Sequence, residues 1–189
     1  MKFFFLILFS LFLGTTGYSQ AFQKEIPADY GYIVKLGQTV PDFDLILHDG
    51  TKTSMKALRG KVVMLQFTAS WCGVCRKEMP HIESDIWQKH KDNPSFALYG
   101  IDLKEEKEKV EEFQKQIGIT YPLALDLDGS IFFSFAQQNA GVTRNVIIDP
   151  NGKIVFMTRL FKEEEFEEMK KVIGLLLTSS KGGGTERDK

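Results

Sequence analysis

The chain has 189 residues, 43% of them hydrophobic, with 16 Phe, so it can bury a full core without disulfide staples. Its formal net charge of −1 lacks the basic excess of a nucleic-acid-binding protein, and we expect no nucleic-acid partner. This length predicts one domain with some additional sequence.

The first 19 residues have the pattern of a signal peptide. Lys2 precedes an apolar run from Phe3 to Leu13, which at about 11 residues is short for a membrane-spanning helix of roughly 20. Gly17 and Ser19 are small, and we expect cleavage after Ser19, with an uncleaved membrane anchor as the alternative. The segment therefore predicts secretion across the inner membrane into the periplasm, where disulfides persist.

The first structured elements are predicted to be a hairpin, a strand and a helix. A polar lead-in over residues 20–39 is followed by an alternating pattern around Asp49-Gly50, which predicts a β-hairpin. The apolar run at 61–69 predicts a central strand buried on both faces. Residues 71–90 predict a helix, which Pro80 is expected to interrupt and kink.

The remaining sequence alternates strands and helices and closes with a hairpin and a helix. In chain order these segments are expected at 95–103, 104–118, 121–126, 130–138, 144–159 and 163–177. The glycine-rich end, 179–189, is predicted to be a disordered tail. This order predicts an α/β sandwich over 40–178, in which the 71–90 helix begins at the carboxyl end of a strand.

Cys72 and Cys75 are the only cysteines, and their spacing is compatible with several kinds of site. Structural zinc needs four ligands, and the chain adds only three histidines, so we expect no metal. Haem attachment requires a histidine where Arg76 stands. A peroxiredoxin-type peroxidase requires threonine three residues before its cysteine, where Ala69 and Cys72 stand instead. A structural disulfide is disfavoured because so short a loop restricts the unfolded chain little.

Redox exchange by the two cysteines has a positive physical basis. At a helix N-terminus, free amide groups and the helix dipole favour the thiolate of Cys72. Cys75, one turn further, is more shielded and placed to resolve a mixed disulfide. Trp71 offers a flat apolar surface to a partner chain, with core packing as the alternative. We expect no cofactor.

Three segments carry a family resemblance: "VPDFDLILHDG", "LRGKVVMLQFTASWCGVCRKEMP" and "VIIDPNGKIV". With them the chain resembles the thioredoxin superfamily from about Val40 to Ile173, and in particular its secreted TlpA-like and ResA-like branch. The "WCGVCRKEMP" core is the most specific part. The resemblance implies a thioredoxin-like three-layer sandwich, with a central mixed sheet flanked by helices and an added N-terminal β-hairpin. It also implies thiol–disulfide exchange with proteins.

The resemblance assigns a role to Glu78, which matches the acidic residue that the branch places beside its cysteines. A partly buried carboxylate there would resist ionisation and could relay a proton to or from Cys75, whereas a surface glutamate is the alternative. Pro80 matches the kinking proline of the family's active-site helix. Gln66 stands where thioredoxin keeps a buried aspartate, and an amide cannot relay protons in that way.

The chain departs from the family where a cis-proline ordinarily precedes the later strand. Thr143 stands there, so we expect a trans peptide, or a strained cis one, and a hydroxyl within reach of the sulfurs. Arg144 either adds positive charge near the thiolate or is solvated. The resemblance implies a substrate groove lined by Trp71, Gly73, Val74, Val142 and Thr143.

We therefore expect a secreted, monomeric thiol–disulfide oxidoreductase acting on protein thiols and disulfides. By analogy with the branch we expect it to act as a reductant that is recharged by a membrane-bound electron donor. The alternatives are a non-catalytic binding or redox-sensing module, and a disulfide-forming oxidant.

Overall fold

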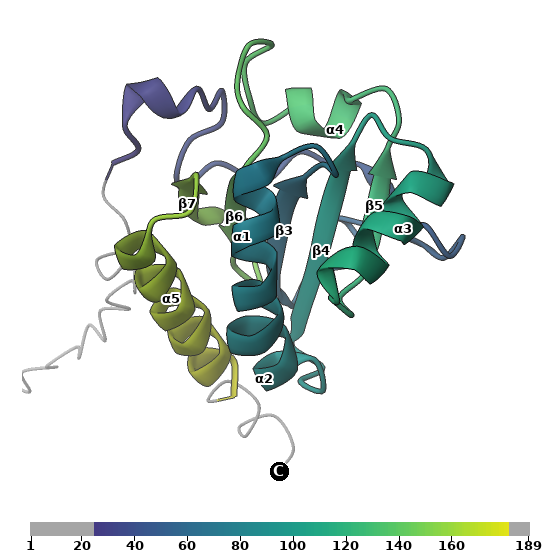
Figure 1. Cartoon of the computed structure of the whole chain (residues 1–189). Helices are drawn as coiled ribbons and strands as arrows, with labels where there is room; N and C mark the ends of the chain where they lie inside the picture. The colour runs from purple at the N-terminus through teal and green to yellow at the C-terminus, as the bar shows by residue number, and fades with distance from the viewer. Residues whose placement is uncertain (1–24, 182–189) are drawn as a thin grey trace, which may run out of the picture.

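The computed structural model describes residues 25–181, and the predicted signal peptide lies outside the described residues. Over this range the chain forms a β-sheet with helices packed on it (Figure 1). In chain order the elements are η1 (Ala28–Tyr30), β1 (Asp44–Ile46), β2 (Lys52–Ser54), β3 (Val62–Thr68), α1 (Gly73–Ile82), η2 (Glu83–Trp87), α2 (Gln88–His90), β4 (Phe96–Leu103), α3 (Lys107–Ile117), β5 (Leu123–Asp126), α4 (Ser130–Phe133), β6 (Arg144–Ile148), β7 (Ile154–Arg159) and α5 (Glu163–Lys181).

The main sheet has five strands in the order β5-β4-β3-β6-β7. Strand β3 pairs in parallel with β4, and β4 in parallel with β5, whereas β6 and β7 run antiparallel. Every residue of β3 is buried, as expected for a continuous apolar run in a central strand. The predicted mixed sheet is therefore confirmed, as is the added N-terminal hairpin formed by β1 and β2.

Alternating side chains of β3 face different layers of the protein. Thr68 contacts Met79 on α1, whereas the ring of Phe67 packs against Phe132 and Phe135 on the opposite face. Helices α1 and α5 lie in front of the sheet in Figure 1, with α3 beside α1. The sheet thus lies between two layers, which is the three-layer arrangement predicted from the sequence.

The helix predicted over 71–90 forms, but its winding changes along its length. Pro80 lies inside α1 and does not interrupt it, contrary to the expectation. The departure from α-helical geometry comes one turn later, in the π-helical segment η2. Helix α1 buries the side chains of Cys75, Glu78, Met79 and Ile82 against the sheet.

The lead-in is an integrated part of the domain over its described residues. Tyr30 is buried, and the hydroxyl of Tyr32 donates to the carbonyl oxygens of Asn145 and Thr158, at 3.2 and 2.7 Å. At the other end of the chain, α5 continues to Lys181 and so includes the first three residues of the predicted tail. The rest of that tail lies outside the described residues.

Segments between residues 37 and 48 pair with both outer strands of the sheet. On β7, Gly37 donates to the carbonyl oxygen of Ile154, and the amide of Ile154 donates to Gln38. On β5, Leu47 forms an isolated antiparallel bridge with Ala124. Among the described helices, none has the length and apolar character needed to cross a membrane.

Candidate active site

Cys72 and Cys75 form a disulfide at the start of α1, with their Cα atoms 5.3 Å apart. Cys72 is the N-cap residue of the helix, and its sulfur accepts a hydrogen bond from the amide of Cys75 at 3.1 Å. Cys72 retains 7% exposure and Cys75 none, so an incoming group reaches the Cys72 sulfur first. Residues 25–181 contain no cluster of three or more potential metal-ligating side chains.

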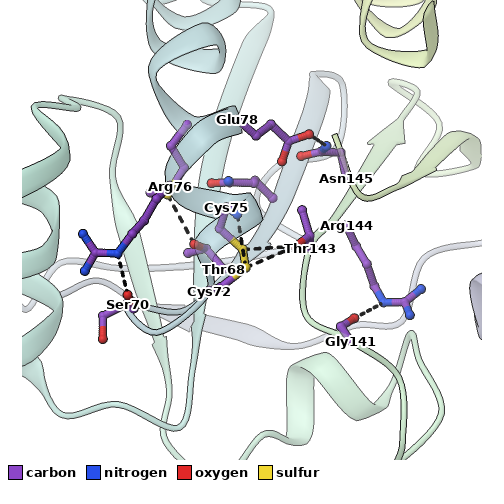
Figure 2. The surroundings of a disulfide bond; sticks show 12 residues. Thr68, Ser70, Cys72, Cys75, Arg76, Glu78, Gly141, Thr143, Arg144 and Asn145 are labelled. Carbon is purple, nitrogen blue, oxygen red and sulfur yellow. Dashed lines mark hydrogen bonds between the residues drawn. A yellow bond between two sulfur atoms is a disulfide. The ribbon is translucent and has the colours of Figure 1, made fainter. Parts of the chain in front are cut away.

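Thr143 lies directly beside the disulfide, as Figure 2 shows. It immediately precedes β6, whose first residue, Arg144, pairs with Phe67 next to the end of β3. The Thr143 hydroxyl lies 3.1 Å from the Cys72 sulfur and 3.3 Å from the Cys75 sulfur. Disulfide sulfurs carry no hydrogen, so the hydroxyl is the donor. Within the described residues every peptide bond is trans, including the bond before Thr143.

Glu78 is buried on α1, which rules out the surface alternative. Its Oε1 accepts a hydrogen bond of 2.7 Å from the side-chain amide of Asn145 on β6. Burial raises the pKa of Glu78 to about 7, and the amides of Asn145 and Gln66 act against that rise by favouring the charged form. A carboxyl in this range exchanges its proton near neutral pH.

Arg144 is fully buried, which rules out the alternative of a solvated side chain. Its Nε donates to the carbonyl oxygen of Gly141 at 3.0 Å, and its guanidinium stacks on the ring of Tyr32, 4.5 Å from the centroid. Figure 2 shows the side chain directed away from the two sulfurs. The structure therefore gives the proposed electrostatic role of Arg144 no direct contact with the disulfide.

The predicted groove residues differ in how much surface they offer. Trp71 is 64% exposed, so core packing is not its role, and Gly73 is exposed beside it. Val74 is half-buried and Val142 is buried. Sequence reasoning missed Leu160, which is 40% exposed and whose amide donates to the carbonyl oxygen of Thr143 at 3.2 Å.

A buried acidic pair beneath the turn before Cys72 was also missed. Glu105 accepts hydrogen bonds from both the amide and the hydroxyl of Ser70, at 2.5 and 2.7 Å, and pairs with Lys109 at 2.6 Å. Asp102 is fully buried, and burial together with the nearby Glu105 raises its pKa. The sequence signal was that Asp102 lies at the carboxyl end of the strand next to β3, and such strand ends meet at one edge of the sheet.

These features define a class of protein. The sulfur of Cys72, which retains slight exposure, caps a helix that follows the carboxyl end of a central strand, and fully buried Cys75 lies one turn behind it. That arrangement can exchange a disulfide through a mixed-disulfide intermediate. The fold and the site together are those of a thioredoxin-like thiol–disulfide oxidoreductase.

Comparison with known proteins places the chain within this class. The AhpC/TSA family profile matches residues 36–157. The thiol-disulfide oxidoreductase ResA of Geobacillus thermodenitrificans is 30% identical over 151 residues, covering 79% of this chain and 80% of that protein. The chain therefore belongs to the AhpC/TSA family and has ResA-type relatives within it.

Two solved structures extend the comparison. A solution structure from Bacteroides thetaiotaomicron, described provisionally as a protein disulfide isomerase, is 58% identical with a TM-score of 0.77, and the match covers 79% of this chain and 94% of that chain. A crystal structure from Chlorobium tepidum, described provisionally as the thiol:disulfide interchange protein DsbE, is 26% identical with a TM-score of 0.66. This match covers 76% of this chain and 99% of that chain.

Proposed function

We propose that the protein is an exported reductant of protein disulfides, in which Cys72 is the nucleophile and Cys75 the resolving cysteine. The observation that carries this proposal is the position of the pair at the start of α1, where Cys72 is the N-cap and keeps 7% exposure while Cys75, one turn in, keeps none. The Cys72 thiolate would accept hydrogen bonds from the amide of Cys75 and from the hydroxyl of Thr143. Both donor atoms lie 3.1 Å from the Cys72 sulfur in the oxidised form. Such charge-assisted bonds favour the thiolate.

The exchange proceeds in two steps. The Cys72 thiolate attacks one sulfur of a substrate disulfide, which breaks that bond, forms a mixed disulfide and releases the first substrate thiolate. Cys75 then loses its proton and attacks the Cys72 sulfur, which releases the second substrate thiolate. Two electrons pass to the substrate, its two thiolates take up two protons, and the Cys72–Cys75 disulfide remains.

Glu78 is the proposed acceptor of the Cys75 proton. It lies three residues after Cys75, on the buried face of the same helix. Its pKa of about 7 is suited to accepting a proton and returning it near neutral pH. When the protein is reduced again, the same carboxyl can return the proton to Cys75.

The substrate groove is proposed to run across the end of the sheet at Cys72. Trp71 and Gly73 supply exposed surface on one side, and Val74 adds a half-buried edge. Thr143 and Val142 form the other side, and little of the Val142 side chain is accessible. The buried side chain of Arg144 supports this side of the groove from within and does not line it.

The leader sequence supports export to the periplasm and, with it, an oxidising environment for the substrates. A reductant working there must be reduced again after each cycle, so we propose a membrane-bound electron donor and action as a monomer. The ResA and DsbE relatives are described as a thiol-disulfide oxidoreductase and a thiol:disulfide interchange protein, which supports exchange with protein thiols.

Insulin reduction with dithiothreitol tests the enzymatic proposal. We expect the mature protein to accelerate insulin precipitation at least tenfold, and Cys72→Ser to abolish the acceleration. Equal rates for the two proteins would leave only a binding or sensing role. The direction of flux follows from the reduction potential, because a value near −120 mV would make the protein an oxidant.

A further inference from the structure

Two buried amide side chains face Glu78 from neighbouring strands. Gln66 on β3 and Asn145 on β6 are direct partners in the antiparallel register, and both are fully buried. Asn145 donates to Oε1 of Glu78 at 2.7 Å. We propose that Gln66 and Asn145, the amide pair, position the Glu78 carboxyl and set the pH at which it exchanges its proton. This inference rests on the proposed role of Glu78.

The orientation of Gln66 is fixed from its far side. The hydroxyl of Tyr121 donates to Oε1 of Gln66 at 2.8 Å, which leaves the Nε2 end to face the other way. Gly100, the partner of Gln66 on β4, has no side chain, and this leaves room for Leu123 beside the Tyr121 ring. A Cβ at Gly100 would lie 2.3 Å from a Leu123 methyl and 3.4 Å from the Tyr121 ring. The donor end of the amide is therefore available to Glu78.

The remaining unpaired atoms are complementary. Within residues 25–181, Nε2 of Gln66 and Oε2 of Glu78 are both buried, and neither atom has a hydrogen-bond partner. The Gln66 amide lowers the pKa of Glu78, as the amide of Asn145 does, and so favours the carboxylate. Asn145 is bonded to one carboxylate oxygen, and the proposal assigns the Gln66 amide to the other. Thr158 holds Asn145 in turn, with its hydroxyl 2.9 Å from the Asn145 Nδ2.

No described cation pairs with the Glu78 carboxyl, so hydrogen bonds and burial dominate its proton affinity. The titratable side chains that interact with it electrostatically are Tyr32 of the lead-in and Tyr121 before β5. Burial raises the pKa of both tyrosines, so they remain neutral around pH 7. The positive charges of Arg144 and Arg159 act on Tyr32 by lowering its pKa, against the larger effect of burial.

The amide pair has a defined effect on the proton. The NH₂ group of each amide donates a hydrogen bond to a carboxyl oxygen, and such a bond is stronger when the carboxyl group is charged. They therefore oppose burial, which favours the neutral acid. Removing either donor should raise the pKa of Glu78 and move proton exchange to higher pH.

The test is a pH titration of the Glu78 carboxyl carbon by ¹³C NMR in the reduced full-length protein. Gln66→Met and Asn145→Leu keep the approximate size of the side chain but remove the donor. Each is expected to raise the Glu78 midpoint by about one pH unit, the size of one hydrogen bond to a charged group. The pH midpoint of mixed-disulfide resolution in a rapid-mixing assay should move by the same amount.

Gln114→Met is the matched control, because the Gln114 amide also contacts Tyr121, through the carbonyl oxygen at 2.9 Å, but not Glu78. It should leave the Glu78 midpoint unchanged. Midpoints in Gln66→Met and Asn145→Leu equal to that of the wild type would overturn the inference, and one folded variant is sufficient to decide. Insulin reduction that is insensitive to Cys72→Ser would sink the proposed function instead, while the carboxyl titration would still report on the amide pair.

Discussion

At the scale of single residues, hydrogen-bond donors converge on the two sulfurs. The Cys75 amide and the Thr143 hydroxyl both reach the Cys72 sulfur at 3.1 Å. The amide comes with the helix and is present wherever a cysteine caps a helix in this way. The hydroxyl depends on threonine at position 143, where the resemblance leads one to expect proline. Substitution at position 143 should therefore change the reduction potential of the Cys72–Cys75 pair.

Thr143→Val should make the reduction potential more negative. Valine keeps the branched shape but removes the hydroxyl, which favours the Cys72 thiolate more than the neutral disulfide. Loss of a bond worth about 1.4 kcal/mol corresponds to roughly 30 mV for this two-electron couple. Equilibration with glutathione or dithiothreitol buffers, followed by alkylation, measures the change.

Thr39→Val is a suitable control, since that hydroxyl contacts Lys153 and lies on a different part of the fold. The potential should then equal that of the wild type. An unchanged potential in Thr143→Val would remove the hydroxyl from the redox site.

Sequence reasoning located the residues whose identity is chemically distinctive and missed those that act only through position. Cys72 and Cys75 could be found because thiols are rare in this chain and three residues apart. Asn145 could not, because an amide within the apolar run of a strand has no motif, and its relation to Glu78 depends on strand pairing. The same holds for the bonds between Glu105 and Ser70, which join two loops 35 residues apart.

At the scale of secondary-structure elements, periodicity was sufficient for the sheet and the main helices. Strand β3 and the β1–β2 hairpin fall within the predicted segments because their apolar pattern and turn residues are local signals. The described lead-in gave no such signal, since its contacts are made by isolated aromatic residues. Tyr32 is the clearest case, because its ring supports the Arg144 guanidinium and its hydroxyl bonds to two strands.

Tyr32→Ala should therefore destabilise the whole domain. The change removes a half-buried ring, takes from a buried guanidinium the nearer of its two aromatic partners, and deletes the hydroxyl contacts with β6 and β7. We expect the free energy of unfolding to fall by about 2–3 kcal/mol. Urea denaturation followed by circular dichroism measures it.

Ile33→Ala provides the comparison, because Ile33 is the next residue and is largely exposed. Its effect should stay within about 0.5 kcal/mol. Equal effects of the two changes would show that the lead-in does not contribute through Tyr32.

At the scale of the whole molecule, buried acids set the direction of the pH dependence of stability. The pKa of Glu78 rises from 4.5 to about 7 on folding, so the folded state holds a proton that the unfolded state releases. Stability is then lost as the pH rises from about 4.5 to about 7. The raised pKa of Asp102 acts in the same direction, whereas the lowered pKa of His90 acts in the opposite one.

The free energy of unfolding should accordingly be higher at pH 5 than at pH 8. Glu78 alone accounts for up to about 3 kcal/mol of this difference, at 1.36 kcal/mol per pKa unit. Glu78→Gln removes the titrating group and should flatten the profile by that amount. Urea denaturation at half-unit pH intervals provides the measurement, and Glu108→Gln, on the exposed face of α3, should retain the wild-type slope. A Glu78→Gln profile parallel to that of the wild type would contradict the assignment.

The pairing of residues 37–48 with both outer strands has a consequence for how the protein behaves in concentrated solution. An uncovered outer strand presents amide and carbonyl groups that can template the addition of another chain. Here Ile154 on one side and Ala124 on the other are already bonded to this single stretch, which reaches both margins of the sheet. Addition of another chain at these two positions would therefore first require local detachment of that stretch, and such an opening is smaller than global unfolding.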